Sequence, residues 1–526
     1  MDNNNVLIRI TNLKQYFPLK KRGMYVKAND GISLDIYKGE TFGLVGESGC
    51  GKSTLGRVLL QLYHQTDGKT MYYGRTRDSL APKYVRDTVQ NAEKLRSQLQ
   101  ELNAKRDKLI AEFNAYVERE KALSEEQLEK HSQEKFLKQD ERDQAVKAAN
   151  DAFLNIATIL GGFISVKDLN ECKNAYMESH RIALELRNLN ETLNDLDMNR
   201  RDIECAIEVK QKDEKSAGGL AKRVKAFDDR INEQKALIAK KEEELKASYK
   251  ALNALRAKYA DDPEFQKYEA YRDDGIDLAR LSYNEMRHLR KDIQLIFQDP
   301  YSSLNARLTV GQIIGEGLLA HSFFKKNDES MQEYVMQVME DCGLAPYMIH
   351  RYPHQFSGGQ RQRIGIARSL ALKPKFVVCD EAVSALDVSI QSQIINLLQD
   401  LKEKENLTYM FISHDLSVVK YISDRIGVMY LGNLVELANK EEIFDNPRHP
   451  YTEALLSAIP TTDVDQKQEA ILLEGDIPSP INPPKGCKFH TRCRYCTDIC
   501  KIVTPEFLEV SPGHFVACHH MVGTSE

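Results

Sequence analysis

Short apolar runs separated by turn residues make up the first part of the chain. Between residues 6 and 45, the runs VLIRI, GISLDIYKGE and TFGLVG predict β-strands, because apolar clusters bounded by turn residues are typical of strands. Strand-like and helix-like patterns alternate again from residue 275 to about residue 445. This alternation predicts an α/β fold on both sides of an intervening block.

The intervening block, from about Thr70 to about Asp274, has a different character. Lys, Glu, Gln, Asn, Leu and Ala dominate it, and glycine and proline are few, so the block predicts helices. Its apolar residues recur every seven positions in three columns, which indicates coiled-coil helices. The columns are Leu95, Leu102, Leu109, Tyr116 and Leu123; Ile182, Leu189, Leu196 and Ile203; and Val224, Ile231, Ile238, Leu245 and Leu252.

Two glycine pairs interrupt the helical block. Gly161-Gly162 lies near its middle, where an antiparallel hairpin has to reverse direction, and we predict the hairpin tip there. Gly218-Gly219 predicts a break in the returning arm. Since runs of mixed charge are often only solvated, a charged and partly disordered spacer is the alternative.

Composition and charge limit the partners and the compartment. The 526 residues suffice for two or three domains. The chain has 73 Lys and Arg against 78 Asp and Glu, and this net charge of -5 gives no broad cationic field, so we expect no nucleic-acid partner. Apolar runs of roughly 18 residues are absent, and the N-terminus lacks a signal-peptide pattern, so we expect a cytoplasmic chain.

A glycine-rich segment follows the apolar strand FGLV. It fits the pattern GxxxxGK[ST], and the run STLGRVLLQLY after it is compatible with a helix. This context predicts a P-loop, in which backbone N–H groups and a helix N-terminus face phosphate oxygens. We expect Lys52 to reach the terminal phosphates of ATP and Ser53 to bind Mg²⁺. The candidate ATP-binding residues of this segment are Gly46, Ser48, Gly49, Cys50, Gly51, Lys52, Ser53 and Thr54.

Two acidic residues end a second apolar strand in the segment KFVVCDEAVSALD. We expect Asp380 to hold the magnesium ion through water and Glu381 to polarise the attacking water. An acidic pair after a strand is commonplace by itself. This interpretation therefore depends on the motifs that follow.

The segment Phe356-Ser357-Gly358-Gly359-Gln360 precedes the helical run RQRIGIARSLAL. It strongly resembles the LSGGQ signature of ATP-binding cassette (ABC) ATPases, with Phe in place of the first Leu. In that family the signature begins a helix and contacts the γ-phosphate of ATP that the P-loop of a second subunit holds. The resemblance implies this role in trans for Ser357, Gly358, Gly359 and Gln360.

Further motifs occur in the order typical of the family. Gln298 in IFQDP resembles the Q-loop glutamine, which senses Mg²⁺ and nucleotide and couples to the membrane subunit. Asp387 in SALD resembles the D-loop, and His414 in FISHD resembles the switch histidine that contacts the γ-phosphate. Phe17 in NLKQYFP lies where such proteins stack an aromatic ring on adenine. Tyr16 is the alternative for that role, and a core aromatic is the other interpretation of Phe17.

Several longer segments resemble the ABC importers for oligopeptides, dipeptides and nickel. They include GESGCGKSTLGR, DIQLIFQDPYSSLNARLTV and PRHPYTEALLSAIP, and the YFP start resembles the second ATPase subunit of an oligopeptide importer. The resemblance implies a peripheral subunit on the cytoplasmic face of the membrane, whose ATP hydrolysis powers import of oligopeptides or related nutrients. It also implies a second ATPase subunit as heterodimer partner, two membrane permeases and an extracytoplasmic substrate-binding protein.

ABC ATPases of chromosome maintenance and DNA repair are the alternative, because they also interrupt the ATPase domain with a long coiled coil. In those proteins the coil separates the Q-loop from the signature, whereas here the block precedes Gln298. We therefore favour the importer. The domains we expect are 1–78 and 275–445 as the two parts of the ATPase core, 79–274 as the helical insertion and 446–526 as a C-terminal tail.

Cysteines crowd in the C-terminal tail. In a cytosolic chain, crowded cysteines indicate metal ligation more than disulfides. We expect Cys487, Cys493, Cys500 and Cys518 to bind one metal centre, and four thiolates suit a 4Fe-4S cluster or Zn²⁺. The tail resembles the C-terminal motif of peptide importers, which implies the cluster. Cys496 is an alternative ligand, and reduced cysteines packing a small domain are the alternative to a metal.

Overall fold

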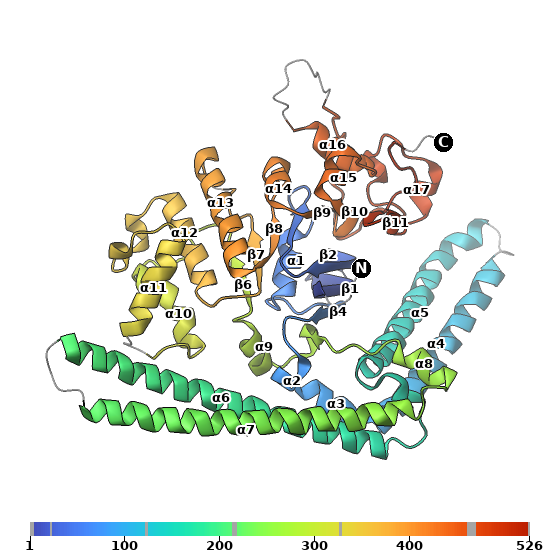
Figure 1. The fold of residues 1–526 in the computed structure, drawn as a ribbon. Coiled ribbons are helices and arrows are strands. Elements are labelled where there is room, and N and C mark those ends of the chain that lie inside the picture. The colour runs from blue at the N-terminus through green and yellow to red at the C-terminus, as the bar shows by residue number, and fades with distance from the viewer. Residues whose placement is uncertain are drawn as a thin grey trace. The chain divides into compact units, whose positions relative to one another are not determined.

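The structure, a computed structural model, divides into two compact units. It describes residues 5–20, 24–120, 125–212, 218–325, 329–384, 386–459 and 470–523. The first unit comprises Met1–Gly74, Asp197–Phe227 and Asp277–Glu526, and the second comprises Arg75–Leu196 and Asp228–Ile276 (Figure 1). Within the described ranges, no helix has the length and apolar character needed to span a membrane.

The larger sheet of the first unit has eight strands. In spatial order they are β11 (Leu508–Ser511), β12 (His514–Val516), β10 (Asn433–Asn439), β9 (Arg425–Tyr430), β3 (Thr41–Val45), β8 (Thr408–Ile412), β7 (Phe376–Asp380) and β6 (Ile293–Ile296). Pairing is parallel from β9 to β6 and antiparallel from β11 to β9. Every residue of β3, β7 and β8 is buried, as parallel strands covered on both faces require.

A smaller sheet has four strands. Their order is β2 (Tyr25–Tyr37), β1 (Val6–Pro18), β4 (Asp67–Tyr72) and β5 (Ile276–Asp277). Strand β1 pairs antiparallel with both β2 and β4. The predicted strands of residues 6–45 are therefore shared between the two sheets.

The helices of the first unit lie between the strands in sequence. They are α1 (Lys52–Leu59), α9 (Tyr283–Leu289), α10 (Val310–Ala320), α11 (Glu329–Asp341), α12 (Gly358–Leu370), α13 (Val388–Glu405), α14 (Leu416–Ile422), α15 (Lys440–Asp445), α16 (Pro450–Ser457) and α17 (Asp498–Ile502). Short 3-10 helices lie at Leu278–Arg280, Pro346–Met348, Pro353–Gln355 and His490–Arg492. One apolar core joins strand residues such as Val377 and Phe411 to helix residues such as Ile314 and Ile364.

The second unit is helical. Its elements are α2 (Arg77–Leu80), α3 (Lys83–Gln90), α4 (Ala92–Glu120), α5 (Glu125–Leu160), the 3-10 helix Gly161–Ser165, α6 (Asn170–Lys212), α7 (Gly218–Ala257) and α8 (Pro263–Glu269). Helices α6 and α7 continue into the first unit's residues 197–227. Figure 1 shows α4 beside α5 and α6 beside α7.

The helices of each pair run antiparallel, because residue numbers rise along one helix and fall along the other from contact to contact: Lys138 to Tyr116 and Arg142 to Phe113 in the first pair, and Ser179 to Ser248 and Glu185 to Lys241 in the second. The guanidinium of Arg142 on α5 lies 4.3 Å from the ring centroid of Phe113 on α4. Between α6 and α7, Lys241 Nζ lies 2.8 Å from the Glu185 carboxylate. Seven residues of the second and third apolar columns are buried: Ile182, Leu196, Ile203, Ile231, Ile238, Leu245 and Leu252.

The predicted hairpin tip at Gly161-Gly162 is wrong. Both glycines are buried and join the α4–α5 pair to the α6–α7 pair. A Cβ atom on Gly162 would lie 2.5 Å from the Phe265 ring, so glycine allows α8 to pack closely against this junction. At the second glycine pair, where we predicted a break, α7 begins after α6 has ended at Lys212. Residues 213–217 between these two helices lie outside the described residues, as does Leu123 of the first column.

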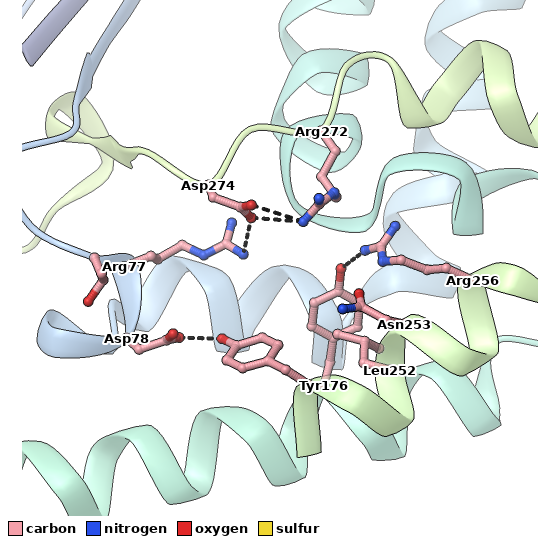
Figure 2. Close-up of a pocket in the computed structure, with 10 residues that line it drawn as sticks. Arg77, Asp78, Tyr176, Leu252, Asn253, Arg256, Arg272 and Asp274 are labelled. Carbon is pink, nitrogen blue, oxygen red and sulfur yellow. Dashed lines mark hydrogen bonds and ion pairs between the residues drawn. The ribbon is translucent and has the colours of Figure 1, made fainter. Parts of the chain in front are cut away.

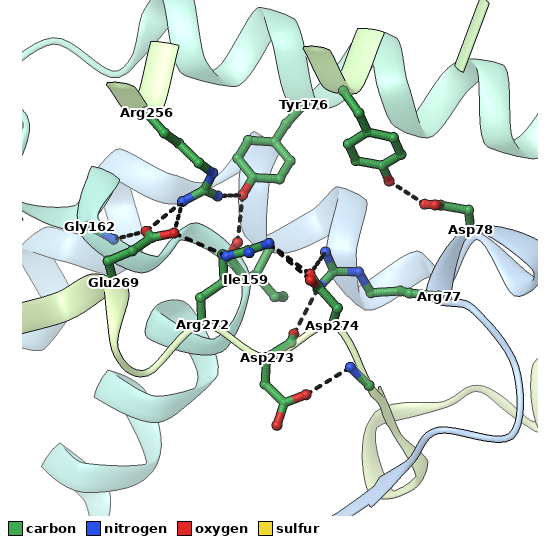
Figure 3. Close-up of polar contacts among 12 residues, drawn as sticks. Arg77, Asp78, Ile159, Gly162, Tyr176, Arg256, Glu269, Arg272, Asp273 and Asp274 are labelled. Carbon is green, nitrogen blue, oxygen red and sulfur yellow. Dashed lines mark hydrogen bonds and ion pairs between the residues drawn. The ribbon is translucent and has the colours of Figure 1, made fainter. Parts of the chain in front are cut away.

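A polar network ties the two ends of the second unit together (Figure 3). Arg77 lies 3.3 Å from the carboxylate of Asp274, although almost 200 residues separate them in sequence. Arg272 contacts both Asp274 and Glu269 at 3.0 Å. The Arg256 side chain is only 10% exposed and lies 2.5 Å from Glu269. Removing one partner of such a buried pair is costly, because a buried charge is left without a counter-charge.

The same network lines a cavity of about 340 Å³ (Figure 2). The Tyr176 hydroxyl donates to the Ile159 carbonyl at 2.8 Å, and the Tyr249 hydroxyl donates to Asp78. Each arginine of the lining has an acidic partner, since Arg77 and Arg272 both contact Asp274, and Arg256 contacts Glu269.

Candidate nucleotide-binding site

The P-loop connects β3 to α1 through a backbone path that requires glycine. Gly46, Gly49 and Gly51 have φ values of 147°, 80° and 103°. Residues with a Cβ atom rarely adopt such positive φ values. A Cβ atom at Gly46 would lie 2.2 Å from the Met429 carbonyl oxygen, and one at Gly51 would lie 2.1 Å from that of Ala28. Both positions therefore admit glycine alone, whereas Gly49 is needed for its conformation only.

Lys52 and Ser53, the first residues of α1, lie at the carboxyl edge of the sheet. Lys52 is 5% exposed. Its ammonium donates to the carbonyl oxygens of Gly46 at 2.6 Å and Glu47 at 3.0 Å. The Ser53 hydroxyl donates to Asp380 Oδ1 at 2.5 Å. Hydroxyl and carboxylate oxygens are ligands that Mg²⁺ prefers, so this pair fits a magnesium site.

Arg57 is a member of the site that the motifs did not predict. Its guanidinium lies 3.4 Å from Asp380 Oδ2. It follows Ser53 by four residues on α1, and side chains at that spacing share one face of a helix. That spacing is the sequence signal that could have revealed it.

Three residues predicted to be catalytic lie together after β6, β7 and β8. Gln298 Nε2 donates to Glu381 Oε2 at 2.5 Å, and His414 Nδ1 lies 3.5 Å from Glu381 Oε1. Glu381 has a φ of 48°, which is rare for a residue with a side chain, and its N–H donates to the Ile412 carbonyl at 3.0 Å. This conformation at the end of β7 directs Asp380 and Glu381 to different partners.

The signature residues begin α12 and are engaged with each other. Gln360 N–H donates to Ser357 Oγ at 3.4 Å, and Ser357 N–H donates to Gln360 Oε1 at 3.1 Å. Ser357 and Gly358 are exposed, and Asp387 precedes α13 as its N-cap residue. The structure thus brings the P-loop together with Asp380, Glu381, Gln298 and His414. The side chains of Ser357 and Gln360 instead contact residues of the signature itself.

The two candidate adenine-stacking residues differ in their contacts. Phe17 is half-buried and meets the Tyr63 ring edge-on, with 5.3 Å between ring centroids. The Tyr16 hydroxyl donates to Asp30 Oδ1 at 2.5 Å, so its ring is held by a polar contact. The choice of Phe17 stays a prediction.

The five tail cysteines are free thiols. Burial raises the pKa of Cys493 to about 11 and that of Cys518 to about 12. Two of the predicted ligands are joined by a backbone contact, since the Cys487 N–H donates to the Cys500 carbonyl at 2.8 Å. In the part of the chain that the structure describes, no three Cys, His, Asp or Glu side chains are arranged to hold one metal ion. The structure therefore gives the predicted metal centre no direct support.

Comparison with known proteins places this site in a family. The model of the ABC transporter family matches residues 29–154 and 264–384, and the model "Oligopeptide/dipeptide transporter, C-terminal region" matches residues 435–500. The oligopeptide transport ATP-binding protein AppF of Bacillus subtilis is 55% identical over 47% of this chain and 75% of its own length. A putative peptide import ATP-binding protein of Brucella ovis is 54% identical over 47% of this chain and 77% of its own length.

A solved structure of cbiO1 from Clostridium perfringens, part of the ABC transporter complex cbiONQ, is more distantly similar. It is 13% identical, and the match covers 84% of this chain and 92% of cbiO1 with a TM-score of 0.41. The sequence matches are much closer and coincide with the P-loop, Gln298 and the Asp380-Glu381 pair. On these matches the chain belongs to the ABC transporter family, as one of its ATP-binding and ATP-hydrolysing proteins.

Proposed function

We propose that this chain is the ATPase subunit of an importer for oligopeptides or related small nutrients, bound to the cytoplasmic face of the membrane. The observation that carries the proposal is the meeting of Gln298 and His414 on the Glu381 carboxylate, next to the Ser53–Asp380 pair. Relatives named as peptide import ATP-binding proteins support the transported class. They favour an importer over an ATPase of chromosome maintenance or DNA repair.

The residues of the site divide the work of phosphoryl transfer. Lys52 supplies a buried positive charge for the terminal phosphates, and the P-loop glycines let backbone N–H groups approach them. Ser53 and Asp380, with Gln298, would hold Mg²⁺, which neutralises charge developing on the phosphates when it is bound. Glu381 accepts a proton from the attacking water, and His414 contacts the γ-phosphate beside it. Phe17 stacks on adenine.

The proposal requires a second ATPase subunit. Ser357, Gly358, Gly359 and Gln360 form a helix start at which Ser357 and Gly358 are exposed, and its N–H groups suit a phosphate held by another chain's P-loop. Asp387 borders the same contact as the D-loop. Two permeases and an extracytoplasmic substrate-binding protein complete the assembly. Purification of a tagged chain from membranes tests this: a second ATPase and permeases should co-purify, and recovery with DNA-repair proteins instead would contradict the importer.

We propose residues 79–274 as an accessory arm between the two parts of the ATPase core, residues 1–78 and 275–445. The arm contains two helix pairs with coiled-coil character, and Arg77 and Asp274 hold its ends together. Because its ends are adjacent, joining residue 78 to residue 275 should leave the core folded and ATP hydrolysis in the assembled complex within about twofold of the intact chain, since insertions with close ends are tolerated. A folded, assembled complex without hydrolysis would show that the arm belongs to the catalytic machinery.

We propose that the tail, residues 446–526, binds one metal centre through Cys487, Cys493, Cys500 and Cys518. The support is the resemblance of the tail to the C-terminal motif of peptide importers, together with the match of residues 435–500, which contain Cys487, Cys493 and Cys500, to the oligopeptide/dipeptide transporter C-terminal region. A 4Fe-4S cluster is preferred to Zn²⁺. Anaerobic purification should give brown protein with about four iron atoms per chain. Stoichiometric zinc without iron would contradict the cluster, and a folded tail without metal would contradict the site.

A further inference from the structure

Glu47, the second residue of the P-loop, is held by two side chains from the far end of the sequence. Its N–H donates to the Tyr451 hydroxyl at 2.9 Å. Its carboxylate receives both ends of the Arg492 guanidinium, Nη1 to Oε2 at 2.7 Å and Nη2 to Oε1 at 3.1 Å. Its carbonyl oxygen accepts from the Lys52 ammonium at 3.0 Å. The N–H and the carboxylate of Glu47 are thus held from outside the loop, and its carbonyl is held by Lys52 within the loop.

Arg492 is itself fixed. Its side chain is 7% exposed, and it ends a 3-10 helix that starts directly after Phe489. The Phe489 ring is buried and packs on Tyr430 and Tyr451, with centroid separations of 5.2 and 5.3 Å. A bidentate contact between a rigidly held guanidinium and a carboxylate is strong and directional. Arg492 therefore fixes the position of the Glu47 side chain.

A second contact joins the same segment to the adenine side of the site. Lys488 Nζ lies 2.9 Å from Asp30 Oδ2 and donates to the Leu431 carbonyl at 3.2 Å. Asp30 also accepts the Tyr16 hydroxyl at 2.5 Å, on the strand that carries Phe17. Residues 488–492 therefore contact both the phosphate loop and the strand expected to face the base.

We propose that Arg492 is a positioning residue for nucleotide binding, which acts through Glu47 to hold the P-loop in its phosphate-binding shape. The C-terminal element thereby sets the affinity of the chain for ATP. This inference rests on the proposed role of the P-loop in ATP binding. It assigns to the tail an effect on the nucleotide site that does not depend on whether the tail holds a metal.

Titration of the intact chain with a fluorescent ATP analogue tests the inference. Arg492→Met should raise the Kd for the nucleotide about tenfold, because a charge-assisted contact that orders the loop is lost. In the assembled ATPase, the rise in KM for ATP should be larger than any fall in kcat. The matched control is Arg494→Met, since Arg494 is half-exposed and pairs with Glu453 at 2.7 Å without touching the P-loop. Its Kd should equal that of the unsubstituted chain.

A double substitution separates positioning from general loss of structure. If Arg492 acts through Glu47, adding Arg492→Met to Glu47→Gln should raise the Kd much less than it does in the unsubstituted chain, because contacting residues are not additive. Arg492→Lys should recover part of the affinity and serves in the same titration if Arg492→Met does not fold. An unchanged Kd in the Arg492 variants, an equal rise in Arg494→Met, or additive effects in the double variant would overturn the inference. Failure of the unsubstituted chain to bind ATP would instead contradict the proposed function.

Discussion

Replacing Glu381 by Gln leaves ATP bound but removes most of its turnover. Gln has nearly the same shape as Glu, so the contacts that Lys52 and Ser53 offer to the phosphates stay in place. An amide cannot take a proton from water, and loss of a general base typically lowers a rate by about 10²- to 10⁴-fold. Phosphate release by the assembled complex and ATP binding by the chain are the two measurements.

Glu403→Gln is the matched control for this substitution. Glu403 is an exposed residue of α13, and the change removes the same charge from the surface. The control should hydrolyse ATP at the rate of the unsubstituted complex. Near-normal steady-state hydrolysis by the Glu381→Gln complex would show that another group activates the water.

Replacing Lys52 by Ala abolishes nucleotide binding. The Lys52 ammonium is the positive charge buried within the P-loop, and both of its carbonyl acceptors are loop residues. Losing charged contacts to phosphate should weaken ATP binding by about 100-fold or more. Titration with nucleotide measures the loss. Lys404→Ala, which removes a half-exposed lysine paired with Asp341 at 2.7 Å, is the control and should bind normally.

The result of this titration also bears on the P-loop assignment. Tight ATP binding by Lys52→Ala would exclude residues 46–53 from phosphate binding. The outcome differs from that expected for Glu381→Gln, which keeps its affinity and loses its rate. The two substitutions together therefore separate binding from chemistry.

The parts of the site that lie in continuous motifs could be predicted from sequence. Each of these motifs follows an apolar strand, and parallel strands end at one edge of the sheet, so Ser53 and Asp380 were expected to meet although 327 residues apart. The structure also places His414 beside Glu381, with 3.5 Å between His414 Nδ1 and Glu381 Oε1.

The arrangement of the helical block could not be predicted in the same way. Gly161-Gly162 suits a hairpin tip, but glycine serves equally where a neighbouring side chain comes close to the backbone, as the Phe265 ring does at Gly162. Seven-residue columns indicate which faces are buried without indicating which helix covers them. The sequence therefore predicted helices and apolar faces, and the structure supplied the two pairs.

No local sequence pattern predicts the contact between Arg492 and Glu47. The two residues are 445 positions apart, and neither is one of the residues that define a motif. Arg492 and Arg494 look alike in the sequence, yet one is buried against the P-loop and the other pairs with Glu453. Only the fold distinguishes a positioning arginine from a surface arginine here.

The most direct test of the importer is peptide accumulation by the assembled transporter in membrane vesicles, measured together with ATP hydrolysis. We expect a labelled oligopeptide to accumulate when ATP is supplied to the side that carries this chain, and the accumulation to stop with Glu381→Gln. The permeases and the second ATPase subunit are the same in both preparations. Accumulation that continues at the same rate with Glu381→Gln, or ATP hydrolysis without movement of any peptide tested, would contradict the account.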